Sequence, residues 1–182
     1  MRMRFMPSLV PADILKELSS MRRYARSLTR DESAADDIVQ DALIKALKKR
    51  DTFRAGGSTR GWLLAIVHNV FVSTRRRERA EANRDARFAE EMIDRLEPDQ
   101  EYSAYLSEIA QAFAALPEHH RAVLHLVAIE GQSYQAAATI LDLPIGTVMS
   151  RLSRARATLR RTCGPETGAY SHLRIVGGQD AD

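Results

Sequence analysis

Side chains that donate hydrogen bonds recur at helical spacing late in the sequence. They are Thr147, Arg151, Arg154, Thr158 and Arg161. Spacings of three, four and seven residues predict that these donors share one face of a helix. No Asp or Glu lies between Asp142 and Glu166, so the arginines have no acidic neighbour in the sequence and present a concentrated positive potential. Guanidinium groups bind phosphate oxygens and base edges, which makes nucleic acid the expected ligand of this face.

Two short helices joined by a tight turn are expected to position these donors. Ser133 can cap the first helix, and the stretch 142–144 ends it, since its proline removes a donor and disfavours helix just before itself. Asp142 tolerates the left-handed backbone of such a turn. The second helix begins near Ile145 and has an apolar stripe of Val148, Leu152, Ala155 and Leu159. The pattern predicts a helix-turn-helix, whose second helix enters the major groove of DNA. A solvated arginine-rich helix at the end of an ordinary bundle is the alternative.

Two amphipathic helices are expected in the first fifty residues. The first has an apolar face of Ile14, Leu18, Met21, Ala25 and Leu28, and the second, from about 34 to 50, has one of Val39, Ala42, Leu43, Ala46 and Leu47. The opposite face of the second helix carries Asp37, Gln40 and Asp41. With no lysine in that turn, these three residues form an acidic edge available to a basic partner. A solvated face, with acids placed favourably near a helix N-terminus, explains the same spacing.

A loop with two glycines, residues 52–60, leads into an uncharged run over residues 61–74, which predicts a mostly buried helix. His68 and Asn69 are polar exceptions in this run, and buried residues of these types usually form hydrogen bonds within the core. Four arginines follow directly: Arg75, Arg76, Arg77 and Arg79. A glycine-rich loop, an aromatic helix with Trp62 and an arginine cluster suit single-stranded nucleic acid, whose bases stack or enter pockets while arginines hold the phosphates.

Composition limits the remaining possibilities. The 182 residues include 27 Lys plus Arg and 24 Asp plus Glu, a formal charge of +3, so the basic character is local. One cysteine, Cys163, cannot form an internal disulfide, and no apolar run is long enough to span a membrane, so we expect a cytoplasmic protein. His119, His120 and His125 lack the paired spacing of metal ligands and are interpreted as scattered surface residues. We expect no catalytic residue, metal or cofactor, and hence no enzyme.

The predicted fold is all-α, with two small helical domains joined by a flexible linker. The first domain is expected over residues 8–88, the acidic linker over 89–102, the second domain over 103–163 and a mobile tail over 164–182. Two apolar stretches before the helix-turn-helix are expected to form the core of the second domain. They comprise Leu106, Ile109, Phe113 and Leu116, then Val123, Leu126, Val127 and Ile129.

Three stretches in a fixed order carry a family resemblance. They are RYARSLTRDESAADDIVQDALIKALKK, FRAGGSTRGWLLAIVHNVFVSTRRR and LPEHHRAVLHLVAIEGQSYQAAATILDLPIGTVMSRLSRARATLRR. They resemble, in turn, the polymerase-binding helices of sigma region 2, the promoter-melting and minus-10 part of that region, and sigma region 4. The chain is thereby identified as similar to an extracytoplasmic-function (group 4) sigma factor of the sigma-70 family, the initiation subunits of bacterial RNA polymerase.

The resemblance implies a role for each predicted face. The acidic edge of Asp37, Gln40 and Asp41 would bind the beta-prime clamp of core RNA polymerase. The unpaired minus-10 strand of the promoter would be held by Arg60, Trp62, His68, Asn69, Arg75 and Arg76. The minus-35 duplex would be read by Thr147, Val148, Ser150, Arg151 and Arg154. Further expected partners are the beta flap of the polymerase and an anti-sigma factor that controls the chain in a stress response.

Two other functions compete with this interpretation. A sigma-like adaptor would sequester an anti-sigma factor without binding DNA, but it needs no intact arginine face and usually carries a receiver domain, and neither condition matches this sequence. An ordinary dimeric helix-turn-helix repressor would leave the tryptophan helix and its arginines unexplained.

Overall fold

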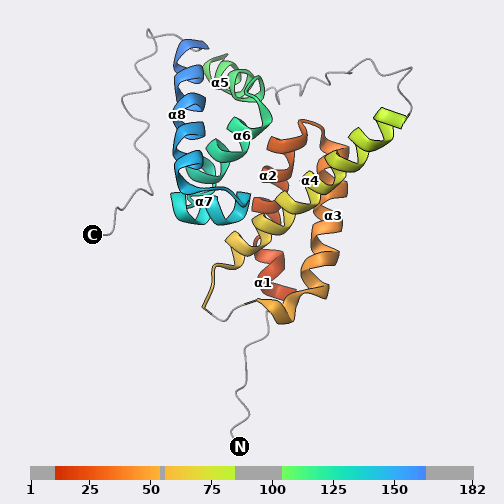
Figure 1. Ribbon diagram of the computed structural model, residues 1–182. Coiled ribbons are helices and arrows are strands. Elements are labelled where there is room, and N and C mark those ends of the chain that lie inside the picture. The colour runs from red at the N-terminus through yellow and green to blue at the C-terminus, as the bar shows by residue number, and fades with distance from the viewer. Residues whose placement is uncertain (1–10, 54–55, 85–103, 163–182) are drawn as a thin grey trace, which may run out of the picture. The chain divides into compact units, whose positions relative to one another are not determined.

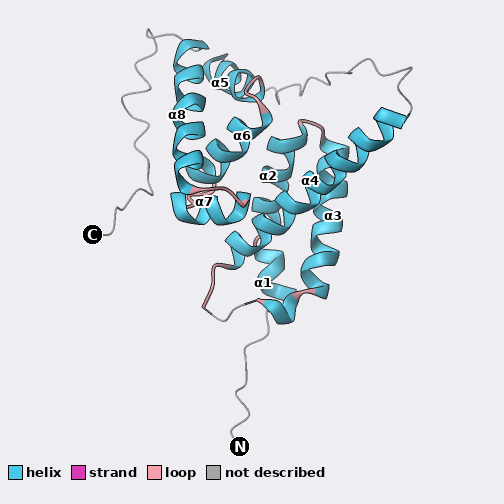
Figure 2. Cartoon of the chain, in the orientation of Figure 1, coloured by secondary structure: helices cyan, strands magenta, loops and turns pink. Residues whose placement is uncertain are grey.

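The computed structural model describes residues 11–53, 56–84 and 104–162, and every regular element in these ranges is a helix (Figure 2). The chain divides into two compact units, Met1–Ile93 and Asp94–Asp182. The predicted all-α fold with two domains is therefore confirmed, while the exact domain boundaries stay a prediction. The predicted linker 89–102, the predicted tail 164–182 and Cys163 lie outside the described residues. No helix in the described ranges combines the length and apolarity needed to cross a membrane.

The first unit is built around three long helices that pack against one another (Figure 1). Its elements are α1 (Pro11–Lys16), α2 (Leu18–Thr29), α3 (Glu32–Lys48), a 3₁₀ turn η1 (Arg50–Thr52) and α4 (Thr59–Arg84). The side chains at their centre are almost fully buried: Met21, Tyr24 and Ala25 of α2, Val39, Ala42 and Ala46 of α3, and Leu63, Leu64, Val67, Val70 and Phe71 of α4. The uncharged run is thus a buried helix, as predicted.

The first two predicted helices differ from the structure in detail. The single helix expected before residue 30 is two helices, α1 and α2, separated at Glu17, whose carboxylate accepts a hydrogen bond from Arg60 Nε at 2.7 Å. In α3 the buried stripe passes through Ala42 and Ala46, and the next residue is rotated about 100° away. The predicted burial of Leu47 is therefore wrong, since this side chain is 45% exposed.

The second unit packs its helices around the long C-terminal helix. Its elements are α5 (Ala104–Ala114), α6 (Glu118–Leu124), a π-helical turn η2 (His125–Ile129), α7 (Tyr134–Leu141) and α8 (Ile145–Thr162). α8 contacts α5, α6 and α7, and Val148, Leu152 and Ala155 are its buried residues (Figure 1). Val123, Leu126 and Val127 are buried as predicted.

Within residues 104–162, the buried polar side chains include Arg121, His125 and Glu130. Arg121 donates hydrogen bonds to the carbonyl oxygens of Ala114, at 3.1 Å, and Leu116, and so satisfies carbonyl groups at the end of α5. His125 Nε2 lies 3.3 Å from Glu130 Oε1, and both side chains are inaccessible to solvent. The interpretation of His125 as a surface residue is therefore wrong.

The π-helical turn changes the helical phase before the chain enters α7. Its wider winding rotates the residues that follow His125 away from the positions an α-helix would give them. Ile129, predicted to be buried, is 51% exposed for this reason. Gly131, with φ of 65°, then ends the helical stretch.

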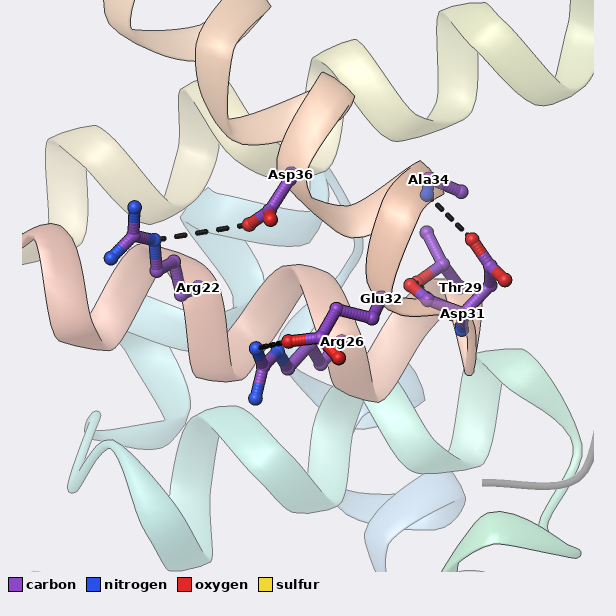
Figure 3. A network of polar contacts seen from close by, with 7 residues as sticks. All are labelled: Arg22, Arg26, Thr29, Asp31, Glu32, Ala34 and Asp36. Atoms are coloured by element: carbon purple, nitrogen blue, oxygen red, sulfur yellow. Dashed lines mark hydrogen bonds and ion pairs between the residues drawn. The ribbon is translucent and has the colours of Figure 1, made fainter. Parts of the chain in front are cut away.

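A polar network joins α2 to α3 (Figure 3). Arg30 adopts a left-handed conformation after α2, and Asp31 caps α3 by accepting a hydrogen bond from Ala34 N at 2.6 Å. Thr29 Oγ1 donates to the carbonyl oxygen of Asp31 at 2.8 Å. Two ion pairs cross between the helices, Arg22 with Asp36 and Arg26 with Glu32. The turn between α2 and α3 thus consists of Arg30 and Asp31.

The cap at Asp31 gives the first testable expectation. Replacing Asp31 by alanine leaves an amide of the first turn of α3 without its acceptor, so the free energy of unfolding of the first unit should fall by about 1 kcal/mol. Fluorescence of Trp62, the only tryptophan in the chain, reports the urea unfolding of this unit. Asp37→Ala removes an exposed charge from the same helix without touching a cap. An equal loss in both variants would show that charge, and not capping, stabilises the helix.

Candidate nucleic-acid and protein interfaces

The acidic edge lies on the face of α3 that points away from the core. Asp37, Gln40 and Asp41 are exposed, while their sequence neighbours Ile38, Val39 and Ala42 are buried. Arg22 and Arg26 of α2 pair with Asp36 and Glu32 respectively. Among the described residues, neither Asp37 nor Asp41 pairs with a cation. The structure therefore leaves an acidic surface that a basic partner can neutralise.

The start of α4 is fixed by polar and aromatic contacts. Ser58 Oγ accepts a hydrogen bond from Gly61 N at 3.0 Å and so caps the first turn. Trp62 is half-buried, and its ring meets that of Phe53 edge to face, with centroids 5.5 Å apart. Arg60 forms an ion pair with Glu17. Arg60 is thus anchored by its ion pair and Trp62 by its ring contact, and part of Trp62 stays accessible.

The two polar residues in the middle of α4 have different environments. His68 is half-buried, and its Nδ1 lies 3.1 Å from Tyr24 Oη, a hydrogen bond that joins α4 to α2. Asn69 is exposed. The interpretation as a polar group hydrogen-bonded within the core therefore fits His68. It does not fit Asn69, which faces solvent and is available to a ligand.

The arginine cluster occupies the part of α4 that extends beyond the buried section. Arg75, Arg76, Arg77 and Arg79 are all exposed. Arg75 pairs with Glu78 at 3.4 Å, which is a weak, solvent-screened contact. Trp62, Asn69 and Arg76 follow one another at intervals of seven residues and so lie along one face of the helix, over about 21 Å.

The helix-turn-helix has the local geometry that the sequence predicts. Ser133 Oγ accepts a hydrogen bond from Ala136 N at 3.1 Å, which caps α7. Asp142 adopts the left-handed conformation, with φ of 52° and ψ of 52°, and Leu143 N donates to the carbonyl oxygen of Ala138 at 3.0 Å. A left-handed residue followed by such a bond ends a helix sharply, so the chain turns directly into α8.

Four of the five residues predicted to read the minus-35 duplex are at least partly accessible. Ser150 and Arg154 are exposed, and Thr147 and Arg151 are half-buried. Val148 is the exception, because its side chain is 0% exposed and packs in the core of the unit. The prediction that Val148 contacts DNA is therefore wrong, and its role is to fix the rotation of α8 so that its neighbours face outward.

His120 of α6 joins this basic face in a way the sequence did not indicate. Burial lowers the pKa of His120 from its ordinary value of 6.5, and the nearby His119, Arg154 and Arg151 lower it further. The rings of His119 and His120 lie edge to face, with centroids 4.4 Å apart. No sequence spacing relates α6 to α8, so only the packing of these helices reveals the cluster.

The lowered pKa of His120 predicts a pH dependence with a definite sign. Because the unfolded chain binds the proton more tightly, the free energy of unfolding of the second unit should decrease as the pH falls through about 6.5. His120→Gln should remove part of this decrease. Circular dichroism during urea unfolding at pH 8 to 5.5, with the Trp62 signal used to identify the first unit, measures it. His119→Gln removes one neighbour that lowers this pKa and should reduce the decrease less than His120→Gln does, and an undiminished decrease in the His120 variant would contradict the assignment.

Comparisons with known proteins place this geometry in a family. Two family models match, the Sigma2 domain of PhyR over residues 14–68 and Sigma-70 region 4 over residues 106–159. The ECF RNA polymerase sigma factor EcfG of Rhodopseudomonas palustris is 36% identical over 148 residues, 81% of this chain and 81% of its own. The ECF sigma factor SigC of Mycobacterium tuberculosis is 34% identical over 140 residues, 75% of this chain and 74% of its own.

Solved structures agree with these relatives. The chain is similar to the sigma factor RpoE from Bartonella quintana, solved in complex with the anti-sigma factor NepR, with 35% identity and a TM-score of 0.72 over 83% of this chain and 94% of that one. It shares only the fold with the anti-anti-sigma factor PhyR of the same organism, at 18% identity and a TM-score of 0.53. The predicted resemblance is confirmed. The chain belongs to the extracytoplasmic-function RNA polymerase sigma factors, which direct the core polymerase to promoters.

Proposed function

We propose that this sigma factor binds core RNA polymerase in the cytoplasm through the acidic edge of α3 and that an anti-sigma factor controls it by covering that access. The observation that carries the proposal is the exposure of Asp37, Gln40 and Asp41 beside arginines that pair with other acids. The similarity to RpoE, whose structure contains the anti-sigma factor NepR, supports control by a protein of that kind. Contact with the beta flap of the polymerase belongs to the same proposal.

The second unit recognises the minus-35 duplex in this proposal. The N-terminal half of a recognition helix enters the major groove. Thr147, Ser150 and Arg151 lie in that half of α8, and Arg154 directly follows it. Arginine in the groove binds the O6 and N7 atoms of guanine through two hydrogen bonds, or a phosphate by charge. Buried Val148 holds these side chains in place.

The first unit holds the opened minus-10 strand. Trp62, Asn69 and Arg76 form one face of α4, and Arg60, His68 and Arg75 belong to other faces of the same helix. A half-buried ring offers a surface for base stacking, and the exposed arginines hold phosphates. His68 would contact the strand only with the part of its ring that its hydrogen bond to Tyr24 leaves accessible.

The match of the first unit to the Sigma2 domain of PhyR favours a second candidate, an adaptor that sequesters an anti-sigma factor. The curated sigma factors support the first candidate more strongly, because their 34 to 36% identity extends over both units of the chain. An adaptor would also gain nothing from exposed Arg154 in a recognition helix.

Binding to the polymerase provides the main test. Replacing both Asp37 and Asp41 by lysine puts like charges against a basic partner, so co-purification with core polymerase should fall at least tenfold while the helical circular-dichroism signal is kept. The control is the double variant Asp51→Lys, Glu81→Lys, which changes the net charge by the same amount at exposed positions elsewhere in the unit. Transcripts started on genomic DNA, mapped by sequencing, should disappear only with the first variant. Equal binding by both variants would overturn the proposal.

Substitutions of Arg154 can distinguish whether its side chain contacts a base or a phosphate. Arg154→Ala should weaken promoter binding of the holoenzyme by about 1–3 kcal/mol if the guanidinium binds a base. Arg154→Lys is the matched control, because lysine keeps the charge and loses the two-bond geometry. If Arg154 contacts a base, the lysine variant should bind the promoter as weakly as the alanine variant. If Arg154 contacts a phosphate, the lysine variant should bind almost as well as the wild type. Binding isotherms at several salt concentrations measure both, and full binding by the alanine variant would exclude contact with the duplex.

A further inference from the structure

Two large apolar side chains are exposed at the start of the recognition helix. Ile145 is 43% exposed and Met149 is 51% exposed. They are four residues apart, so they lie one above the other on α8. In the described part of the second unit, Ile129 is the other large apolar residue with comparable exposure. Single exposed apolar residues need no explanation, but this pair occupies the first two turns of the helix that is proposed to enter DNA.

Their neighbours restrict what can cover this pair. Ser150 and Arg154 are exposed on the same helix, and Arg151 is half-buried beside them. In the second unit no described acidic residue lies on α8, so a negatively charged partner is favoured. The partner must offer apolar groups within a polyanionic surface, and in a major groove the group of that kind is the C5 methyl of thymine.

We propose that Met149, supported by Ile145, is a specificity-determining residue that packs against a thymine methyl in the minus-35 element. This inference rests on the proposed function of α8 as the minus-35 recognition helix. Methionine is unbranched and flexible, so it can follow a methyl group into the groove while Ser150 and Arg154 form polar contacts. Gly146, one turn before Ser150, has no atom within 4 Å of where a Cβ would stand, so the protein itself leaves room beside the pair.

Deoxyuridine substitution tests the contact one methyl group at a time. Each thymine of both strands of the minus-35 element is replaced in turn by deoxyuridine, which removes the methyl and keeps every hydrogen-bonding group. Holoenzyme made with the full chain should bind one or two of these duplexes about fourfold more weakly, the factor expected for one buried methyl. With Met149→Ala the same replacements should have no effect, because the partner of the methyl is already missing.

Matched variants make the outcome decisive. Ile129→Ala shortens a side chain of equal exposure outside α8 and should keep the deoxyuridine effect. Met149→Leu should keep most of it. A wild-type protein insensitive to every deoxyuridine, an equal effect in Met149→Ala, or a minus-35 element without thymine would each overturn the inference. If replacing the whole minus-35 element changes nothing, the proposed function fails instead, whereas loss of binding in Arg154→Ala without any deoxyuridine effect overturns only the role of Met149.

Discussion

Burial of one stripe on each of α3, α4 and α8 is the constraint on which the interfaces depend. A helix that buries Val39 and Ala42, or Val148 and Leu152, cannot rotate without exposing apolar surface, and this fixes which residues reach solvent. The acidic edge and the basic reading face are therefore consequences of core packing. The acidic edge lies about half a turn away from its buried stripe, whereas half-buried Thr147 and Arg151 flank the stripe of α8.

Polar contacts then fix the helices along their axes. Asp31 and Ser133 set where α3 and α7 begin, and left-handed Asp142 sets where α7 ends. The hydrogen bond between His68 and Tyr24 joins α4 to α2 in the first unit. Such contacts add little free energy individually, about 1 kcal/mol each. Their value is positional, because a sharp helix start places the next side chains at a defined angle to the ligand.

The sequence predicted the fold and the accessible faces of the candidate interfaces because their signals are local. Ser133, Asp142 and the exposed Asp37 follow from capping chemistry, turn chemistry and helical spacing, all within a few residues. The failures involve non-local packing. Leu47 was assigned to the buried stripe of α3, but the stripe that packs against α2 and α4 is narrower and excludes it. Ile129 is exposed because of a π-helical turn, which the spacing of apolar residues does not predict. Val148 was predicted both to belong to the apolar stripe of α8 and to contact DNA, and its burial supports only the first of these predictions.

The buried pair of His125 and Glu130 shows how the second unit tolerates polar groups next to its DNA-binding motif. A buried carboxylate is costly unless a partner compensates it, and His125 lies 3.3 Å away across the π-helical turn. The Glu130 backbone NH also donates to the His125 carbonyl oxygen at 3.0 Å, so one residue is held by its main chain and its side chain. Residues five apart lie about 140° from each other on an α-helix, whereas the i→i+5 winding of a π-helical turn brings them close together, so the pair favours the π geometry over an ordinary α-helix. The π-helical turn determines the direction in which the chain enters α7. The buried contact between His125 and Glu130 therefore helps to orient the helix-turn-helix.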